Sequence, residues 1–91
     1  MGRYTLYVDD NFHYMDETSR STRGDYEHED EAIRAAQRII EDSLHDLCRA
    51  GMTPDELLAC YKAFGEEPWI SGSHFSAWAY AEVRCWEIII G

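Results

Sequence analysis

The chain has 91 residues, of which 45% are hydrophobic and 13% aromatic, which supplies apolar surface for one small core and leaves no room for a second. Eighteen acidic residues outweigh eight basic ones, and the formal net charge of −10 argues against nucleic acid and anionic membranes as partners, because both repel an acidic surface. No apolar run approaches a membrane span, and the N-terminal residues lack the pattern of a secretory leader. We therefore expect one small domain, residues 1–91, in the cytoplasm.

The N-terminal part of the chain has the pattern of a β-hairpin. Residues 4–9 alternate between two faces and are rich in aromatic and β-branched side chains, which predicts a strand. Residues 20–26 are the expected return strand, in which Gly24 marks a weak point or a bulge. The polar segment between them carries large apolar side chains that either dock on the core or continue the first strand: Phe12, Tyr14 and Met15.

The longest periodic segment follows the hairpin. Apolar residues at helical spacing predict an amphipathic helix over 31–50, with one face buried in the core. Two beginnings fit the sequence: either Asp30 caps the helix directly, or His28 occupies the cap position and Glu31 reaches back to it. Gly51 is expected to end the helix in a left-handed conformation.

Thr53, Pro54 and Glu56 form the most specific local signal in the chain. Threonine followed three residues later by glutamate is the sequence of a capping box, and proline favours the first helical position. The pattern predicts a short helix over 54–64. Beyond it, an apolar pair within 68–71 predicts a short third strand.

A final helix is expected over 77–89, with Ser76 as its cap. Its apolar surface is unusually broad. One stripe is expected in the core: Trp78, Ala81, Cys85 and Ile88. A second face is more than a small core covers and suggests association, as in a homodimer: Val83, Trp86 and Ile90. Alternatively, the β-prone residues 86–91 leave the helix and add a strand.

The three cysteines are an odd number without C-x-x-C spacing, so they do not read as a disulfide framework. Cys60 and Cys85 fall on apolar helical stripes, where a thiol behaves as a small hydrophobic side chain. We expect Cys48, Cys60 and Cys85 to be core residues of a protein in a reducing compartment.

Two stretches, VDDNFHYMDE at 8–17 and HFSAWAYAEVRC at 74–85, are similar to a family of small uncharacterised bacterial proteins, together with the acidic entry to the first helix. The similarity spans nearly the whole chain. No activity, ligand or catalytic residue is established for that family. The resemblance therefore implies a self-contained domain and no particular function.

One polar cluster follows the first strand and has the chemistry of a site for a divalent metal, because carboxylates and an imidazole suit zinc or manganese. Its candidate ligands are Asp9, Asp10, His13 and Asp16. A solvated, turn-forming loop explains the same residues. The chain has no phosphate loop, dinucleotide fingerprint, G-x-S-x-G elbow or H-E-x-x-H helix, so no catalytic residue and no cofactor is predicted.

The sequence as a whole predicts an α+β domain, in which two main helices pack on one face of an antiparallel sheet of two or three strands and a short helix bridges them. We interpret it as an acidic, non-catalytic protein-interaction domain that contacts another protein or a second copy of itself. Exposed aromatic and apolar side chains would carry the contact: Tyr7, Tyr14, Trp69, Trp86 and Ile90. The same residues would otherwise complete the core. A metal-binding domain and a small enzyme or enzyme subunit are the alternative functions.

Overall fold

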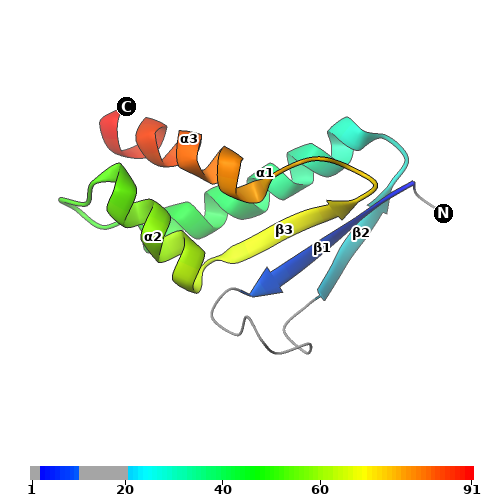
Figure 1. Cartoon of the computed structure of the whole chain (residues 1–91), viewed down its shortest axis with the longest axis horizontal. Helices are drawn as coiled ribbons and strands as arrows, with labels where there is room; N and C mark the ends of the chain where they lie inside the picture. Colours follow the sequence, from blue (N-terminus) through cyan, green and yellow to red (C-terminus); the bar gives the residue numbers. More distant parts are fainter. Residues whose placement is uncertain (1–2, 11–20) are drawn as a thin grey trace.

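A computed structural model of the chain describes residues 3–10 and 21–91. These residues form three strands in one sheet and three helices, which confirms the predicted α+β class. Figure 1 shows the sheet on one side of the molecule and the helices on the other. The elements are, in chain order, β1 (Tyr4–Asp10), β2 (Ser21–Tyr26), α1 (Glu29–Leu47), α2 (Pro54–Phe64), β3 (Glu66–Ser71) and α3 (Ala77–Ile90). The strand order is β2-β1-β3 with antiparallel pairing throughout, so β3 returns after two helices to pair with the first strand.

The alternation predicted for β1 sets the two faces of the sheet. Leu6 and Val8 are buried, and Leu6 packs with Ile70 of β3 against α1. The helix comes close to the sheet because it presents Ala32 and Ala36 there, both fully buried. The opposite face of the sheet carries the intervening residues of β1 and β3.

A β-bulge interrupts the pairing of β1 with β2. Leu6 pairs with Gly24 but Tyr7 pairs with Thr22, which leaves Arg23 as the extra residue of β2. Of the two expectations for Gly24, a weak point or a bulge, the structure has the bulge, at the neighbouring residue. A bulge on an outer strand also hinders pairing with another chain.

The long helix α1 joins two hydrophobic clusters. Its N-terminal half packs on the sheet, and its C-terminal half packs on α2 and α3. Phe75, just before α3, packs against both clusters and connects them. The second cluster consists of Ile40, Leu44, Leu57, Tyr61, Ala77, Ala81 and Cys85.

The bounds of α1 differ from the prediction at both ends. The helix begins at Glu29, and His28 occupies the cap position, as in one of the two expected beginnings, although it makes no side-chain cap bond. The alternative in which Asp30 caps the helix is wrong. Acidic groups of the first turn favour this early start because they lie at the positive end of the helix dipole. The helix ends at Leu47 because Cys48 is already extended, with ψ 133°. Gly51 is left-handed, at φ 85°, but it belongs to the turn before α2 and does not end α1.

The caps of the other two helices match their sequence signals. The Glu56 N–H donates to Thr53 Oγ1 at 3.2 Å and the Thr53 N–H donates to the Glu56 carboxylate at 3.0 Å, which is the predicted capping box. Ser76 accepts from the Ala79 N–H at 3.2 Å and begins α3. The alternative of a strand over 86–91 is wrong, because the helical bonding continues to the bond from the Gly91 N–H to the Glu87 carbonyl.

Candidate interaction surfaces

The helix α3 has two apolar faces on opposite sides. Ala81 and Cys85 are buried against α1 and α2. Val83, Trp86 and Ile90 are 58%, 52% and 68% exposed. At about 100° per residue, these three and the exposed Ala79 lie close to diametrically opposite the buried face. We name this second face the outer stripe: Ala79, Val83, Trp86 and Ile90.

Two other predicted contact residues lie on the face of the sheet turned away from α1. Tyr7 and Trp69 are directly paired across β1 and β3, and their rings stack with centroids 4.5 Å apart and planes 19° apart. Both side chains are half-buried. Stacking accounts for part of their apolar surface and leaves the rest accessible. Tyr14, the remaining candidate, lies outside the described residues.

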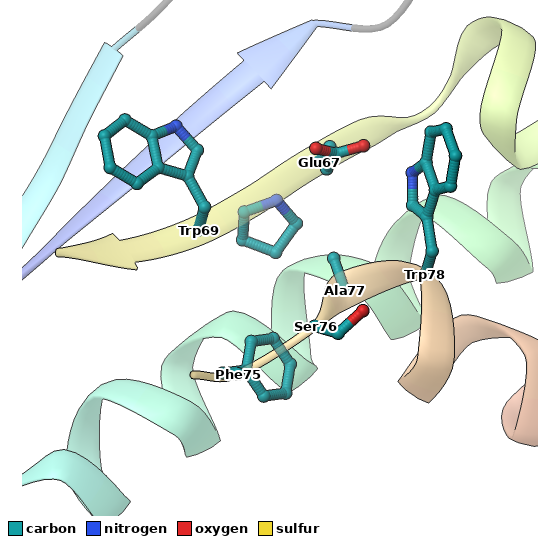
Figure 2. A pocket seen from close by; sticks show the side chains of 7 residues that line it. Glu67, Trp69, Phe75, Ser76, Ala77 and Trp78 are labelled. Carbon is teal, nitrogen blue, oxygen red and sulfur yellow. The ribbon is translucent and has the colours of Figure 1, made fainter. Parts of the chain in front are cut away.

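A cleft of about 340 Å³ lies beside Trp69, between β3 and the start of α3. Figure 2 shows Trp69 at one end of the cleft, Trp78 at the other and the Glu67 carboxylate between them. Strand alternation places Glu67 and Trp69 on one face of β3, and the first turn of α3 brings Trp78 opposite them. The lining is completed by Pro68, Phe75, Ser76 and Ala77.

The charges of the cleft are dominated by Glu67. Burial raises the pKa of the Glu67 carboxyl above its ordinary value of 4.5, a hydrogen bond with the Trp78 side chain opposes this rise in pKa, and the charge of Asp9 adds to it. The Lys62 ammonium lies 4.9 Å from the centre of the Trp78 ring. Lys62 is not part of the lining of the cleft.

The prediction that Trp78 belongs to the buried stripe of the last helix is wrong, since the side chain is 46% exposed. The buried stripe is centred on Ala81 and Cys85, and Trp78 lies on its flank, where Glu67 and Lys62 contact the indole. Sequence reasoning also missed Glu67. The alternation of β3 is the signal that could have placed it beside Trp69, but the strand expected within 68–71 did not include Glu67.

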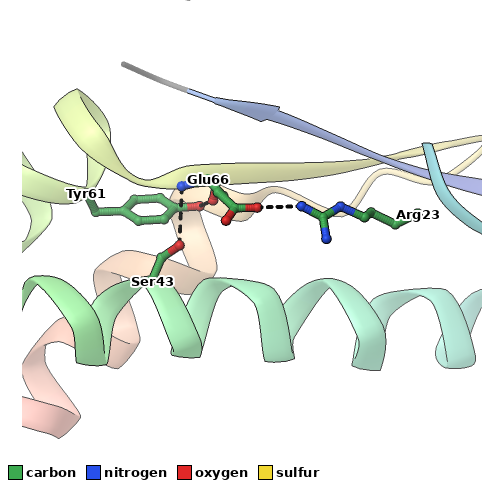
Figure 3. Close-up of polar contacts among 4 residues, drawn as sticks. All are labelled: Arg23, Ser43, Tyr61 and Glu66. Atoms are coloured by element: carbon green, nitrogen blue, oxygen red, sulfur yellow. Dashed lines mark hydrogen bonds and ion pairs between the residues drawn. The ribbon is translucent and has the colours of Figure 1, made fainter. Parts of the chain in front are cut away.

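The outer edge of β3 is largely closed by side chains from the helical layer. The Glu66 N–H donates to the Ser43 hydroxyl oxygen at 3.2 Å, and the Tyr61 hydroxyl donates to the Glu66 carbonyl at 2.8 Å. Figure 3 shows these two bonds. Pro68 has no N–H, and the Ile70 carbonyl accepts from Ser73 at 3.3 Å. Few backbone groups of this edge therefore remain for pairing with another strand. The Arg23 guanidinium reaches the Glu66 carboxylate from β2, at 2.9 Å.

The metal site stays a prediction, because only two of its four candidate ligands belong to the described residues. Asp9 and Asp10 end β1, whereas His13 and Asp16 lie outside the described residues. Within residues 3–10 and 21–91, no three potential ligands of the types His, Cys, Asp and Glu are grouped as a metal site. The cysteines are free thiols; Cys85 is buried, as predicted, and Cys48 and Cys60 are half-buried. Burial raises the pKa of Cys85 to about 11, and Cys48 adds a smaller rise.

Comparisons with known proteins give no family for this chain. No family model, no curated protein and no solved structure matches it. The similarity to small bacterial proteins therefore stays a prediction. In the described part of the chain, no helix combines the length and the apolar character needed to cross a membrane.

Proposed function

We propose that this chain is a small acidic interaction domain that self-associates through the outer stripe of α3. The exposure of the outer stripe is the observation that carries this proposal, because a helix that is apolar on two opposite faces is typically covered on both. The net charge of −10 makes nucleic acid an unfavourable partner. The proposal includes a cytoplasmic location for the domain.

The arrangement of residue sizes in the outer stripe favours a second copy in antiparallel orientation. The four residues follow at intervals of four, three and four, as in the seam of a helix pair. Antiparallel pairing that aligns the whole stripe places Val83 beside the partner's Trp86 and Ala79 beside the partner's Ile90. Each large side chain then meets a small one, which is the condition for close packing.

The flanking charges disfavour the parallel alternative. Glu82 and Glu87 border the outer stripe on opposite sides and are both exposed. In a parallel pair such positions meet across the interface, so Glu82 of one helix would approach the partner's Glu87, and two Trp86 side chains would compete for the same space. Arg84 offsets this repulsion only in part, because its guanidinium is shared between Glu87, at 3.2 Å, and Glu41, at 2.7 Å.

The expected dimer is weak. Trp86 is 52% exposed. About 130 Å² of its surface is therefore accessible, taking about 250 Å² for a whole tryptophan side chain. A stable interface buries about 800 Å² on each partner. The outer stripe is smaller than this, so it can form only the apolar centre of such an interface. Two chains that each carry −10 also repel one another. Added salt screens this repulsion and should therefore strengthen the dimer.

The test is the native mass by light scattering or sedimentation, measured over a wide range of protein concentration at low and high salt. The mass of the parent should rise with concentration and rise further with salt, whereas Trp86→Ala should stay monomeric with an unchanged circular dichroism spectrum. Phe64→Ala is the matched control, since Phe64 is an exposed aromatic residue at the end of α2 and outside the outer stripe. A parent that is monomeric throughout, or a Trp86→Ala variant with the parent's mass, would refute self-association through α3.

A further inference from the structure

We propose that the cleft between β3 and α3 binds the guanidinium group of an arginine side chain, presented by a basic segment of a separate polypeptide. This surface differs from the outer stripe, because none of the residues that line the cleft belongs to that stripe. The inference therefore does not depend on self-association. It rests on the shape of the cleft, its aromatic walls and the position of its carboxylate.

The walls of the cleft suit a flat cation. The indole rings of Trp69 and Trp78 lie at its two ends, and Phe75 adds a third aromatic side chain to the lining. Aromatic faces attract cations through the ring quadrupole, and tryptophan is the strongest of the three aromatic types. A volume of about 340 Å³ accommodates a single side chain and is too small to enclose a folded element.

The carboxylate of Glu67 gives the cleft its polarity. It lies between the two tryptophans, is half-buried, and is near a second acidic residue, Asp9. A partly desolvated carboxylate beside another negative charge is in an unfavourable state unless a cation approaches. The hydrogen bond with Trp78 uses one of the acceptor positions of the carboxylate and leaves others for a ligand.

The chain itself shows that this region attracts cations, since Lys62 places its ammonium 4.9 Å from the centre of the Trp78 ring. Arginine fits the cleft better than lysine does. A guanidinium is planar, stacks on an indole and offers a fork of donors to one carboxylate, whereas an ammonium acts as a point charge. The net charge of −10 adds a long-range attraction for a basic segment.

The experiment uses short peptides with blocked ends, Gly-Arg-Gly and its counterparts with lysine or citrulline in the central position. Citrulline keeps the shape of arginine and lacks its charge. Binding is followed by the NMR signals of the indole N–H groups, assigned with single Trp→Phe variants. The arginine peptide should shift the signals of Trp69 and Trp78 and leave that of Trp86 unchanged, and it should bind more tightly than the other two peptides.

Two variants separate the site from the general charge of the protein. Glu67→Gln keeps an acceptor for Trp78 and should weaken binding of the arginine peptide roughly tenfold, the loss expected for a charge-assisted hydrogen bond. Asp25→Asn is the matched control, because Asp25 is an exposed acid on β2 that binds Thr5, at 2.7 Å, and does not line the cleft. It should leave the affinity nearly unchanged.

Several results would overturn the proposal. If the citrulline or the lysine peptide bound as tightly as the arginine peptide, the cleft would not recognise the guanidinium group. Equal losses of affinity in Glu67→Gln and Asp25→Asn would show that the peptide is attracted by the overall negative charge and does not bind at the cleft. An arginine peptide that lowers the native mass of the protein would assign the cleft to a second copy of the chain. Failure of self-association through α3, by contrast, would appear as a parent that is always monomeric or as equal masses of the parent and Trp86→Ala, and would leave the peptide titration unaffected.

Discussion

The hydroxyl of Tyr61 offers a quantitative test of how β3 is joined to the helices. Tyr61 is fully buried and donates to the Glu66 carbonyl at 2.8 Å, next to the point where α2 ends and β3 begins. Tyr61→Phe keeps the ring and removes the donor, so the Glu66 carbonyl loses a partner in a largely dry environment. An acceptor left unsatisfied in this way costs about 1.5 kcal/mol. For a domain of this size, that loss lowers the melting temperature by about 6–12 °C.

The assay is urea unfolding of the parent and of Tyr61→Phe, followed by circular dichroism. The midpoint should fall while the slope m stays constant, since the surface exposed on unfolding is unchanged. Tyr4→Phe is the matched control, because the structure gives the half-buried Tyr4 no side-chain hydrogen bond within residues 3–10 and 21–91. A loss in Tyr61→Phe no larger than the loss in Tyr4→Phe would refute the role assigned to this hydrogen bond.

The same tyrosine gives the pH dependence its sign. Burial raises the pKa of Tyr61 far above its ordinary value of 10.0, and the charges of Glu67 and Glu66 raise it further. The stabilising contribution of the protonated phenol is complete below pH 10.0 and is lost above it, because the unfolded chain ionises first. The Tyr61→Phe variant has no phenol at this position and so does not lose this contribution to stability. The difference in stability between the parent and Tyr61→Phe should therefore narrow above pH 10.0.

Two further predictions concern packing and thiol reactivity. Gly65→Ala should lower the free energy of unfolding by about 1–3 kcal/mol, because its Cβ would lie 2.5 Å from Tyr61 Cδ1 and 2.8 Å from the Tyr61 carbonyl oxygen; an unchanged urea midpoint would contradict this. Iodoacetamide should label the native protein more slowly at Cys85 than at Cys48 or Cys60, because Cys85 is buried and its pKa is raised to about 11. Peptide mass spectrometry measures the three rates, and equal rates in native and unfolded protein would show that burial does not protect Cys85.

The helices could be predicted from the sequence because their signals are local. The capping box at Thr53 and the cap at Ser76 involve residues three positions apart, and the structure contains both. Strand β3 was expected to be shorter than Glu66–Ser71, because its first residues contain two acids and a proline. Contacts from the helices hold this part of the strand: Ser43 of α1 and Tyr61 of α2 bind the backbone of Glu66.

The candidate surfaces were predictable only to the extent that they lie on one element. The outer stripe could be predicted because it follows from the periodicity of α3 alone. The cleft could not, because it requires Trp78 to meet Glu67 and Trp69 across a gap in sequence that no local pattern spans. The misplacement of Trp78 has the same cause. On the helix, Trp78 lies at the flank of the buried stripe, where periodicity does not decide between the core and the surface. Its contacts with Glu67 and Lys62 place it at the surface.

The net charge of −10 separates the two proposed surfaces by their response to salt. Self-association brings together two negative chains through an apolar stripe, so screening removes an opposing term and should favour the dimer. Binding of arginine brings together opposite charges at Glu67, so screening removes a favourable term and should weaken the complex. In one salt titration, the native mass should therefore rise with salt, while the affinity for the arginine peptide, followed by the indole N–H shifts, should fall. Parallel trends would mean that one surface does not work by the contact assigned to it.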